Sequence, residues 1–166
     1  MSEIISSDQS GFDIKEVVSD LNRLLRLRTT PIGMKLFESV EEMEAVPRIR
    51  RPKAIHTTDQ IVGMASRNGW TVGITEADLV GAQCKTVIGL HPRDKEWLSG
   101  DRYHGVWYAE SEDASAHQHA MDVVPLGQYE AMVVSPLVSG RLNPPDICLI
   151  YATPAQMILF INGLQW

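Results

Sequence analysis

Cys84 is the residue of this chain whose side chain offers the strongest nucleophile. It lies in the stretch GITEADLVGAQCKTVIGLH, among small and apolar residues that end at His91. A thiolate attacks carbon or binds zinc and iron when a nearby base or cation lowers its pKa, and Lys85, His91 and His56 are the candidates for that role. A cysteine on an apolar helix face also packs as a small hydrophobic side chain. Three interpretations of Cys84 stay open: catalytic nucleophile, metal or iron-sulfur ligand, and core packing.

Lys35 is a candidate ligand-binding residue because it interrupts an apolar strand. The run PIGMKLFES places Met34 and Leu36 on either side of it, and alternation of this kind indicates a β-strand. An ammonium group held in a central strand needs an anion, and a bound carboxylate or phosphate serves as well as a protein carboxylate. The alternative is an edge lysine whose charged end reaches water.

A basic cluster follows in the stretch PRIRRPK, which contains three arginines, one lysine and two prolines. The prolines favour an extended or turn backbone, so the segment is predicted to be a loop. Guanidinium groups there, those of Arg50 and Arg51 in particular, can bind the phosphates of a nucleotide or of coenzyme A. A solvated loop is the alternative. No aromatic residues alternate with the cluster, so stacking on nucleic-acid bases has no support.

The junction YATPAQ offers another candidate site. Ligands of open α/β sheets settle beyond the carboxyl ends of strands, where the start of a helix presents free N–H groups. Tyr151, Thr153 and Gln156 are therefore candidate ligand-binding residues. The alternative is that Thr153 and Gln156 only cap the helix that starts at Pro154.

No metal site is expected. On a helix, His117 and His119 lie about 200° apart and cannot bind one ion together, and no third ligand stands at a suitable spacing. The glycine-rich signatures of dinucleotide and phosphate binding and the G-x-S-x-G of hydrolases are absent as well. The sequence therefore identifies no cofactor.

Composition sets the class of protein. The chain has 166 residues, of which 44% are hydrophobic, and this is enough for one domain with a core. We expect a flexible N-terminus over residues 1–11 and a single domain over residues 12–166. The net charge of -6 disfavours nucleic acid and anionic membranes as partners. Because the sequence contains neither a secretory signal nor a membrane span, we expect a cytoplasmic protein with reduced thiols.

Hydrophobic spacing predicts an alternation of helices and strands. Helices are expected over residues 12–28, 56–70, 76–88, 111–124 and 154–166, and strands over residues 31–39, 71–75, 129–137 and 146–152. The last two strands are apolar on both faces, which is typical of central strands covered on both sides. This order predicts an α/β or α+β fold, a layered single domain with a small mixed sheet covered by helices.

The terminal helix is apolar around its whole circumference. Five successive hydrophobic residues, Met157 to Ile161, cover every direction at about 100° per residue. One domain hides only part of such a helix, so we expect a partner there, either a second copy in a homo-oligomer or a different polypeptide. Phe160 and Trp166 are the expected anchors, because aromatic side chains dominate interface energetics.

Four segments carry a family resemblance, and they are LLRLRTTPIGMKLFES, GAQCKTVIGL, VVSPL and PPDICLIYATPAQMILFINGLQW. In this order, from about Leu24 onward, they resemble the DUF169 family of uncharacterised bacterial and archaeal proteins. The family has a lysine at the place of Lys35 and a cysteine in the segment of Cys84. Its members run longer and carry further cysteines that suit a metal or iron-sulfur site. The resemblance thus implies a chain that lacks the family's C-terminal portion and those cysteines.

These observations favour a protein that binds a small anionic metabolite or cofactor as a subunit of a metabolic assembly. Two alternatives stay open. One is an enzyme that uses Cys84 as a nucleophile or as a metal or iron-sulfur ligand. The other is a structural subunit of a hetero-oligomer, held through its terminal helix.

Overall fold

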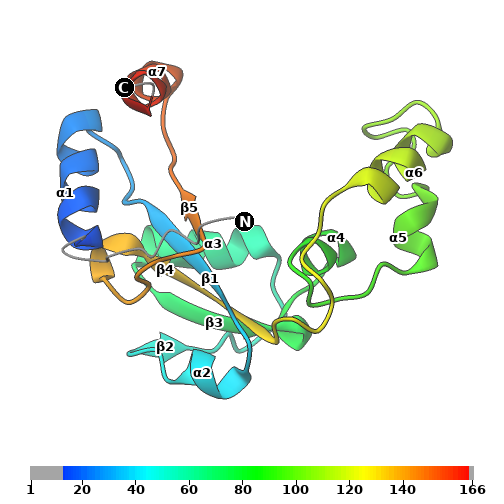
Figure 1. Cartoon of the computed structure of the whole chain (residues 1–166), viewed down its shortest axis with the longest axis horizontal. Helices are drawn as coiled ribbons and strands as arrows, with labels where there is room; N and C mark the ends of the chain where they lie inside the picture. The colour runs from blue at the N-terminus through cyan, green and yellow to red at the C-terminus, as the bar shows by residue number, and fades with distance from the viewer. Residues whose placement is uncertain (1–12, 165–166) are drawn as a thin grey trace, which may run out of the picture.

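β4 (Ala131–Pro136) lies at the centre of the sheet, and all six of its residues are buried. The computed structural model of the chain describes residues 13–164, and in this part five strands form one sheet in the order β2-β3-β4-β1-β5 (Figure 1). The other strands are β1 (Ile32–Phe37), β2 (Ile49–Arg50), β3 (Thr71–Thr75) and β5 (Ile147–Leu149). Since β2 pairs with β3 in parallel and the other pairs are antiparallel, the sheet is mixed, as the sequence predicts.

Alternation along β4 divides the core between the two faces of the sheet. Met132 and Val134 pack in one cluster with the buried residues of α3 (Thr58–Asn68). Ala131 and Val133, which point the other way, pack in a second cluster with α2 (Val40–Glu44). Helices therefore cover both faces of the sheet, and the predicted layered α/β fold is confirmed.

The remaining helices lie around the two ends of this layer. They are α1 (Ile14–Leu25), α4 (Ala82–Val87), α5 (Lys95–Ser99), α6 (Ser111–Ala120) and α7 (Pro154–Leu164), with short 3-10 turns η1 (Glu76–Asp78) and η2 (Leu137–Ser139). α4, α5 and α6 form a group on one side of the sheet, whereas α1 and α7 lie on the other side (Figure 1). Ile14 and Val18 anchor α1 on Leu137.

α3 begins and ends at signals that are visible in the sequence. The Thr57 hydroxyl accepts a hydrogen bond from the Gln60 amide at 3.3 Å, and the Gln60 side-chain oxygen accepts one from the Thr57 amide at 3.0 Å. The helix ends at Gly69, whose φ of 69° is the left-handed conformation that glycine adopts without strain. The predicted capping box and the predicted glycine stop are both confirmed.

β5 corrects one expectation. Residues 146–152 are predicted to form a central strand, but β5 is three residues long and lies at the edge of the sheet, where Ile147 and Cys148 are exposed. Apolar residues on both faces of a segment indicate that burial of both faces is favourable. They do not reveal whether other parts of the same chain bury them. The segment from Pro47 to Lys53 differs in a smaller way, because it contains the short strand β2 where a loop is predicted.

α7 projects beyond β5, away from the sheet (Figure 1). None of its residues is buried, and Ile158, Leu159 and Leu164 are 60%, 61% and 72% exposed. Phe160 is half-buried, and the other expected anchor, Trp166, lies outside the described residues. Within residues 13–164, no helix has the length and apolar character needed to cross a membrane.

The cap of α3 generates a stability prediction with a neighbouring control. Thr57→Val removes the hydroxyl that accepts the Gln60 amide, and we expect it to lower the free energy of unfolding by about 1 kcal/mol. Thr58→Val removes a buried hydroxyl oxygen that has no hydrogen-bond partner in the described residues, so we expect no loss. Urea denaturation of the three proteins measures both effects, and equal losses at the two threonines would contradict this account of the cap.

Candidate functional site

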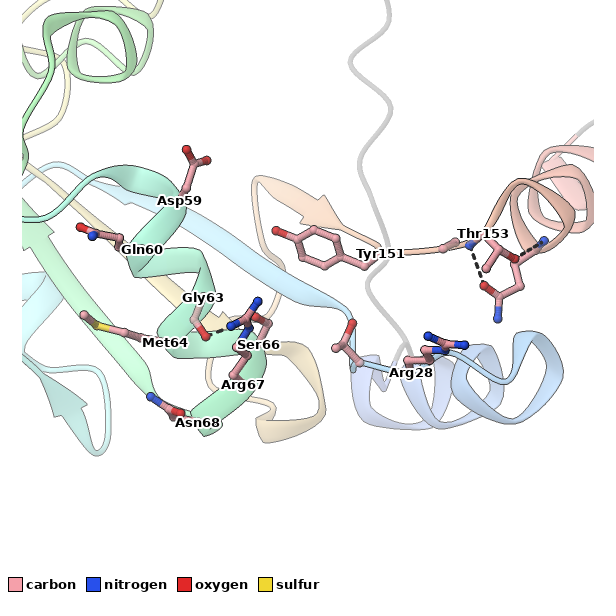
Figure 2. Close-up of a pocket in the computed structure, with 13 residues that line it drawn as sticks. Arg28, Asp59, Gln60, Gly63, Met64, Ser66, Arg67, Asn68, Tyr151 and Thr153 are labelled. Atoms are coloured by element: carbon pink, nitrogen blue, oxygen red, sulfur yellow. Dashed lines mark hydrogen bonds between the residues drawn. The ribbon is translucent and has the colours of Figure 1, made fainter.

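A cavity of about 850 Å³ lies between α3, the α1–β1 connection and the β5–α7 connection (Figure 2). We refer to it as the α3 cavity. Its walls come from three separate parts of the chain, and they contain Arg28, Thr29, Asp59, Gln60, Gly63, Met64, Ser66, Arg67, Asn68, Tyr151, Ala152, Thr153 and Gln156. Three of the sequence-predicted ligand residues, Tyr151, Thr153 and Gln156, are therefore brought together in one wall.

One stripe of α3 forms the wall opposite Tyr151. Asp59, Gly63 and Arg67 follow one another at intervals of four residues, so they share a face of the helix. Ile61 and Ala65, on another face, are fully buried against the sheet. Since the apolar face is fixed by the core, the polar stripe is fixed at the cavity.

The opposite wall is held by the first turn of α7. The Thr153 amide donates to the Gln156 side-chain oxygen at 2.7 Å, and the Gln156 amide donates to the Thr153 hydroxyl at 3.4 Å. The Gln156 side-chain nitrogen donates to the carbonyl oxygens of Leu25 and Arg26, at 2.7 and 3.1 Å, which are left free where α1 ends. Thr153 and Gln156 thus cap α7 and tie it to α1. Tyr151 makes no side-chain hydrogen bond within residues 13–164, and its ring points toward α3 (Figure 2).

The charged groups that line the α3 cavity form no ion pair within residues 13–164. Arg28 and Arg67 make no ion pair with any residue between 13 and 164. Asp59, the carboxylate of the same wall, makes none either. The hydroxyl oxygen of Thr29 is buried and has no hydrogen-bond partner in the described part of the chain. The residues that line the cavity therefore include two arginines and one aspartate whose charged groups have no ion-pair partner within residues 13–164.

Lys35 lies outside the α3 cavity. Its ammonium group donates a hydrogen bond to the carbonyl oxygen of Pro144 at 3.0 Å. Together with Asp146 it lines two other cavities, of about 350 and 520 Å³. Asp146 is engaged with the backbone, since its carboxylate accepts the Leu36 amide at 2.7 Å.

Arg50 and Arg51 contact other parts of the protein. The Arg51 guanidinium forms ion pairs with Asp78 at 2.6 Å and with Glu44 at 3.5 Å. The Arg50 guanidinium lies over the ring of Trp70, 4.6 Å from its centroid, in a cation–π contact. Neither arginine lines the α3 cavity, so the structure does not bring these two predicted ligand residues to Tyr151.

Cys84 is exposed on α4, so the core-packing interpretation of this residue is wrong. Two of the bases considered for it are bound elsewhere. The His91 ring nitrogen Nδ1 lies 2.6 Å from a carboxylate oxygen of Glu76, and the Lys85 ammonium lies 3.8 Å from the same oxygen. Cys148, the other cysteine, is exposed as a residue, but partial desolvation of its sulfur raises the pKa of the thiol, so it is a thiol and not a thiolate near neutral pH.

The part of the chain from α4 to α6 also contains the titratable groups Asp94, Tyr103, His117 and His119. A hydrogen bond from the Trp97 amide to the Asp94 carboxylate, at 2.7 Å, caps α5 and is the main reason why the pKa of Asp94 is lowered. Burial raises the pKa of Tyr103. His117 and His119 are exposed on α6, and no three metal-binding side chains come together anywhere in residues 13–164.

Ten residues of the α3 cavity were not predicted from the sequence, and the charged ones among them are Arg28, Asp59 and Arg67. Asp59 and Arg67 carry a signal, because with Gly63 they repeat every four residues along a predicted helix. Arg28 carries none. It reaches the cavity only because the α1–β1 connection lies beside α3 in the folded chain.

Comparisons with known proteins agree with the resemblance seen in the sequence. The model of the DUF169 family, described as an uncharacterised ArCR family, matches residues 20–166. Neither a curated protein nor a solved structure shows significant similarity to the chain.

Proposed function

The chain belongs to the DUF169 family, and we propose that it binds a small anionic metabolite or cofactor in the α3 cavity. One observation carries this proposal. Arg28 and Arg67 approach the cavity from different elements and have no acidic partner in the described residues. Two guanidinium groups that face one cavity form a binding site for a carboxylate or a phosphate, because each presents paired N–H donors.

Size and charge support this proposal. The volume of about 850 Å³ falls within the range of about 300–1,000 Å³ that is usual for ligand pockets. The chain as a whole carries a net charge of -6 and repels anions at a distance, so an anionic ligand depends on local attraction by these arginines. A cytoplasmic location, where such metabolites are abundant, belongs to the same proposal.

We further propose that α7 is the surface through which the chain joins a second copy in an assembly. Its residues from Pro154 to Leu164 include no charged side chain, and four of its apolar side chains are exposed, those of Ile158, Leu159, Ile161 and Leu164. Two acidic chains can therefore meet at α7 without bringing like charges together. Burial of apolar surface then stabilises the assembly by about 25 cal/mol for each Å² removed from water.

Binding in the α3 cavity is tested by a thermal-shift screen of nucleotides, acyl-coenzyme A esters and small carboxylates. When its concentration is 100 times its dissociation constant, a ligand of the wild-type protein raises the melting temperature by roughly 5–10 °C. We expect Arg28→Met and Arg67→Met each to lower the affinity for that ligand by about 10- to 100-fold, since each removes a charge-assisted hydrogen bond.

Two variants control this screen. Arg23→Met removes an exposed arginine of α1 that pairs with Asp20 and lies outside the cavity, so the shift is expected to stay as in wild type. Lys35→Met removes the lysine of the other cavities. A shift that is lost in Lys35→Met and kept in Arg28→Met and Arg67→Met would contradict the proposal, and so would a screen in which no anion stabilises the protein.

Self-association through α7 is tested by sedimentation velocity at micromolar concentration. We expect the wild-type chain to sediment as a dimer or larger oligomer, and Leu159→Glu to sediment as a monomer because it places a charge in the apolar contact. Val106→Glu is the matched control, since Val106 is 70% exposed in the connection between α5 and α6. A monomeric wild-type chain would contradict the proposal, as would a Val106→Glu protein that dissociates to the same extent.

A further inference from the structure

Gly63 is a glycine that the fold does not require. It lies in the interior of α3, where glycine is less favourable than alanine because it loses more backbone freedom on folding. Its φ is not positive, so its backbone conformation suits any residue. Outside the surrounding turns of its own helix, a Cβ atom at Gly63 would meet no atom of residues 13–164 within 4 Å. Neither backbone strain nor packing within the described residues explains this glycine.

Other glycines of the chain do have a packing reason, and they show the contrast. A Cβ on Gly33 would lie 2.4 Å from a methyl group of Leu137, and one on Gly73 would lie 2.4 Å from a methyl group of Ile49. Both are strand residues with side chains packed directly over them. At Gly63 the corresponding space is open, and Gly63 lines the α3 cavity.

The wall across the cavity from Gly63 carries an aromatic ring. Tyr151 extends from the β5–α7 connection toward the face of α3 that bears Gly63 (Figure 2). The Tyr151 side chain is 57% exposed, although a phenol ring favours contact with another flat surface.

From this arrangement we infer that the anion bound in the α3 cavity carries a flat aromatic ring, which lies on the bare backbone at Gly63 and contacts the ring of Tyr151. The inference rests on the proposed function, in which Arg28 and Arg67 bind the anionic group. A ring can touch the helix backbone at a van der Waals distance only where no Cβ holds it away. The ligand class is thus an aromatic phosphate or carboxylate, and a purely aliphatic anion would gain nothing from Gly63.

The experiment compares phenyl phosphate with cyclohexyl phosphate, which has the same number of ring carbons and the same phosphate group but a puckered ring. Isothermal titration calorimetry of the full chain should give about 3- to 10-fold tighter binding for phenyl phosphate. Tyr151→Leu, which keeps an apolar side chain of similar reach, should abolish that preference. Its control is the cyclohexyl compound, whose affinity should stay nearly the same.

Gly63→Ala adds a readout that a purely structural role of Gly63 would not produce. We expect it to raise the melting temperature of the free protein by about 1–4 °C, because alanine has the higher helix propensity. We also expect it to lower the affinity for phenyl phosphate by about tenfold. Gly163→Ala is the matched control, because Gly163 lies in α7, its Cβ position is also open, and it does not line the cavity. That variant should leave the affinity unchanged.

The possible results separate the inference from the proposed function. If both phosphates bind equally and Gly63→Ala leaves their affinity unchanged, the aromatic-ring inference is overturned while anion binding stands. If Gly63→Ala lowers the melting temperature, the fold does require Gly63, and the inference falls on that ground. If neither phosphate binds at millimolar concentration, the inference and the proposed binding of phosphates both fail.

Discussion

The packing of α3 on the sheet is the constraint on which the candidate site depends. Ile61 and Ala65 are fully buried and Val62 is nearly so, in one cluster with residues of β1, β3 and β4. Burial of each larger apolar side chain contributes roughly 1.5–3 kcal/mol, so a rotation of α3 about its axis is costly. Because the buried face is fixed, Gly63 and Arg67 are fixed at the cavity, and the capping box at Thr57 sets where the helix begins.

Features that depend on neighbouring residues could be predicted from the sequence. The strands β1 and β4 follow from apolar runs, and the caps at Thr57 and Thr153 follow from side chains that reach an amide three residues away. The order of helices and strands was sufficient for the α/β class.

Features that depend on distant residues could not be predicted. The α3 cavity exists because Gln156 binds the carbonyl of Leu25, a residue 131 positions earlier, and so holds the β5–α7 connection beside α1. No local pattern indicates that contact. Arg28, which lies close to it in the chain, was missed for the same reason, whereas Arg50 and Arg51 were conspicuous in sequence and are engaged elsewhere.

Cys84 shows how a helical pattern can be correct while the buried face is wrong. The residue does lie on a helix, but the one buried residue of α4 is Thr86. Two positions along a helix correspond to a rotation of about 200°, so burial of Thr86 turns Cys84 toward solvent. A six-residue helix packs through few side chains, and its hydrophobic pattern is too short to define a face.

Exposed apolar surface distinguishes the C-terminal elements from the rest of the fold. β4 is buried along its whole length, whereas β5 is an edge strand and α7 has no buried residue. Both elements adjoin the α3 cavity through Tyr151 and Gln156. The proposed assembly surface and the proposed ligand site therefore lie at opposite ends of one connection.

Hydrogen–deuterium exchange of the full chain, with and without saturating phenyl phosphate, tests most directly whether the α3 cavity is the anion site. The account predicts slower exchange at the amides of α3 and of the β5–α7 connection, and unchanged exchange in β1 around Lys35, which lines other cavities. Protection centred on Lys35, with α3 and residues 151–156 exchanging as in the free protein, would contradict it.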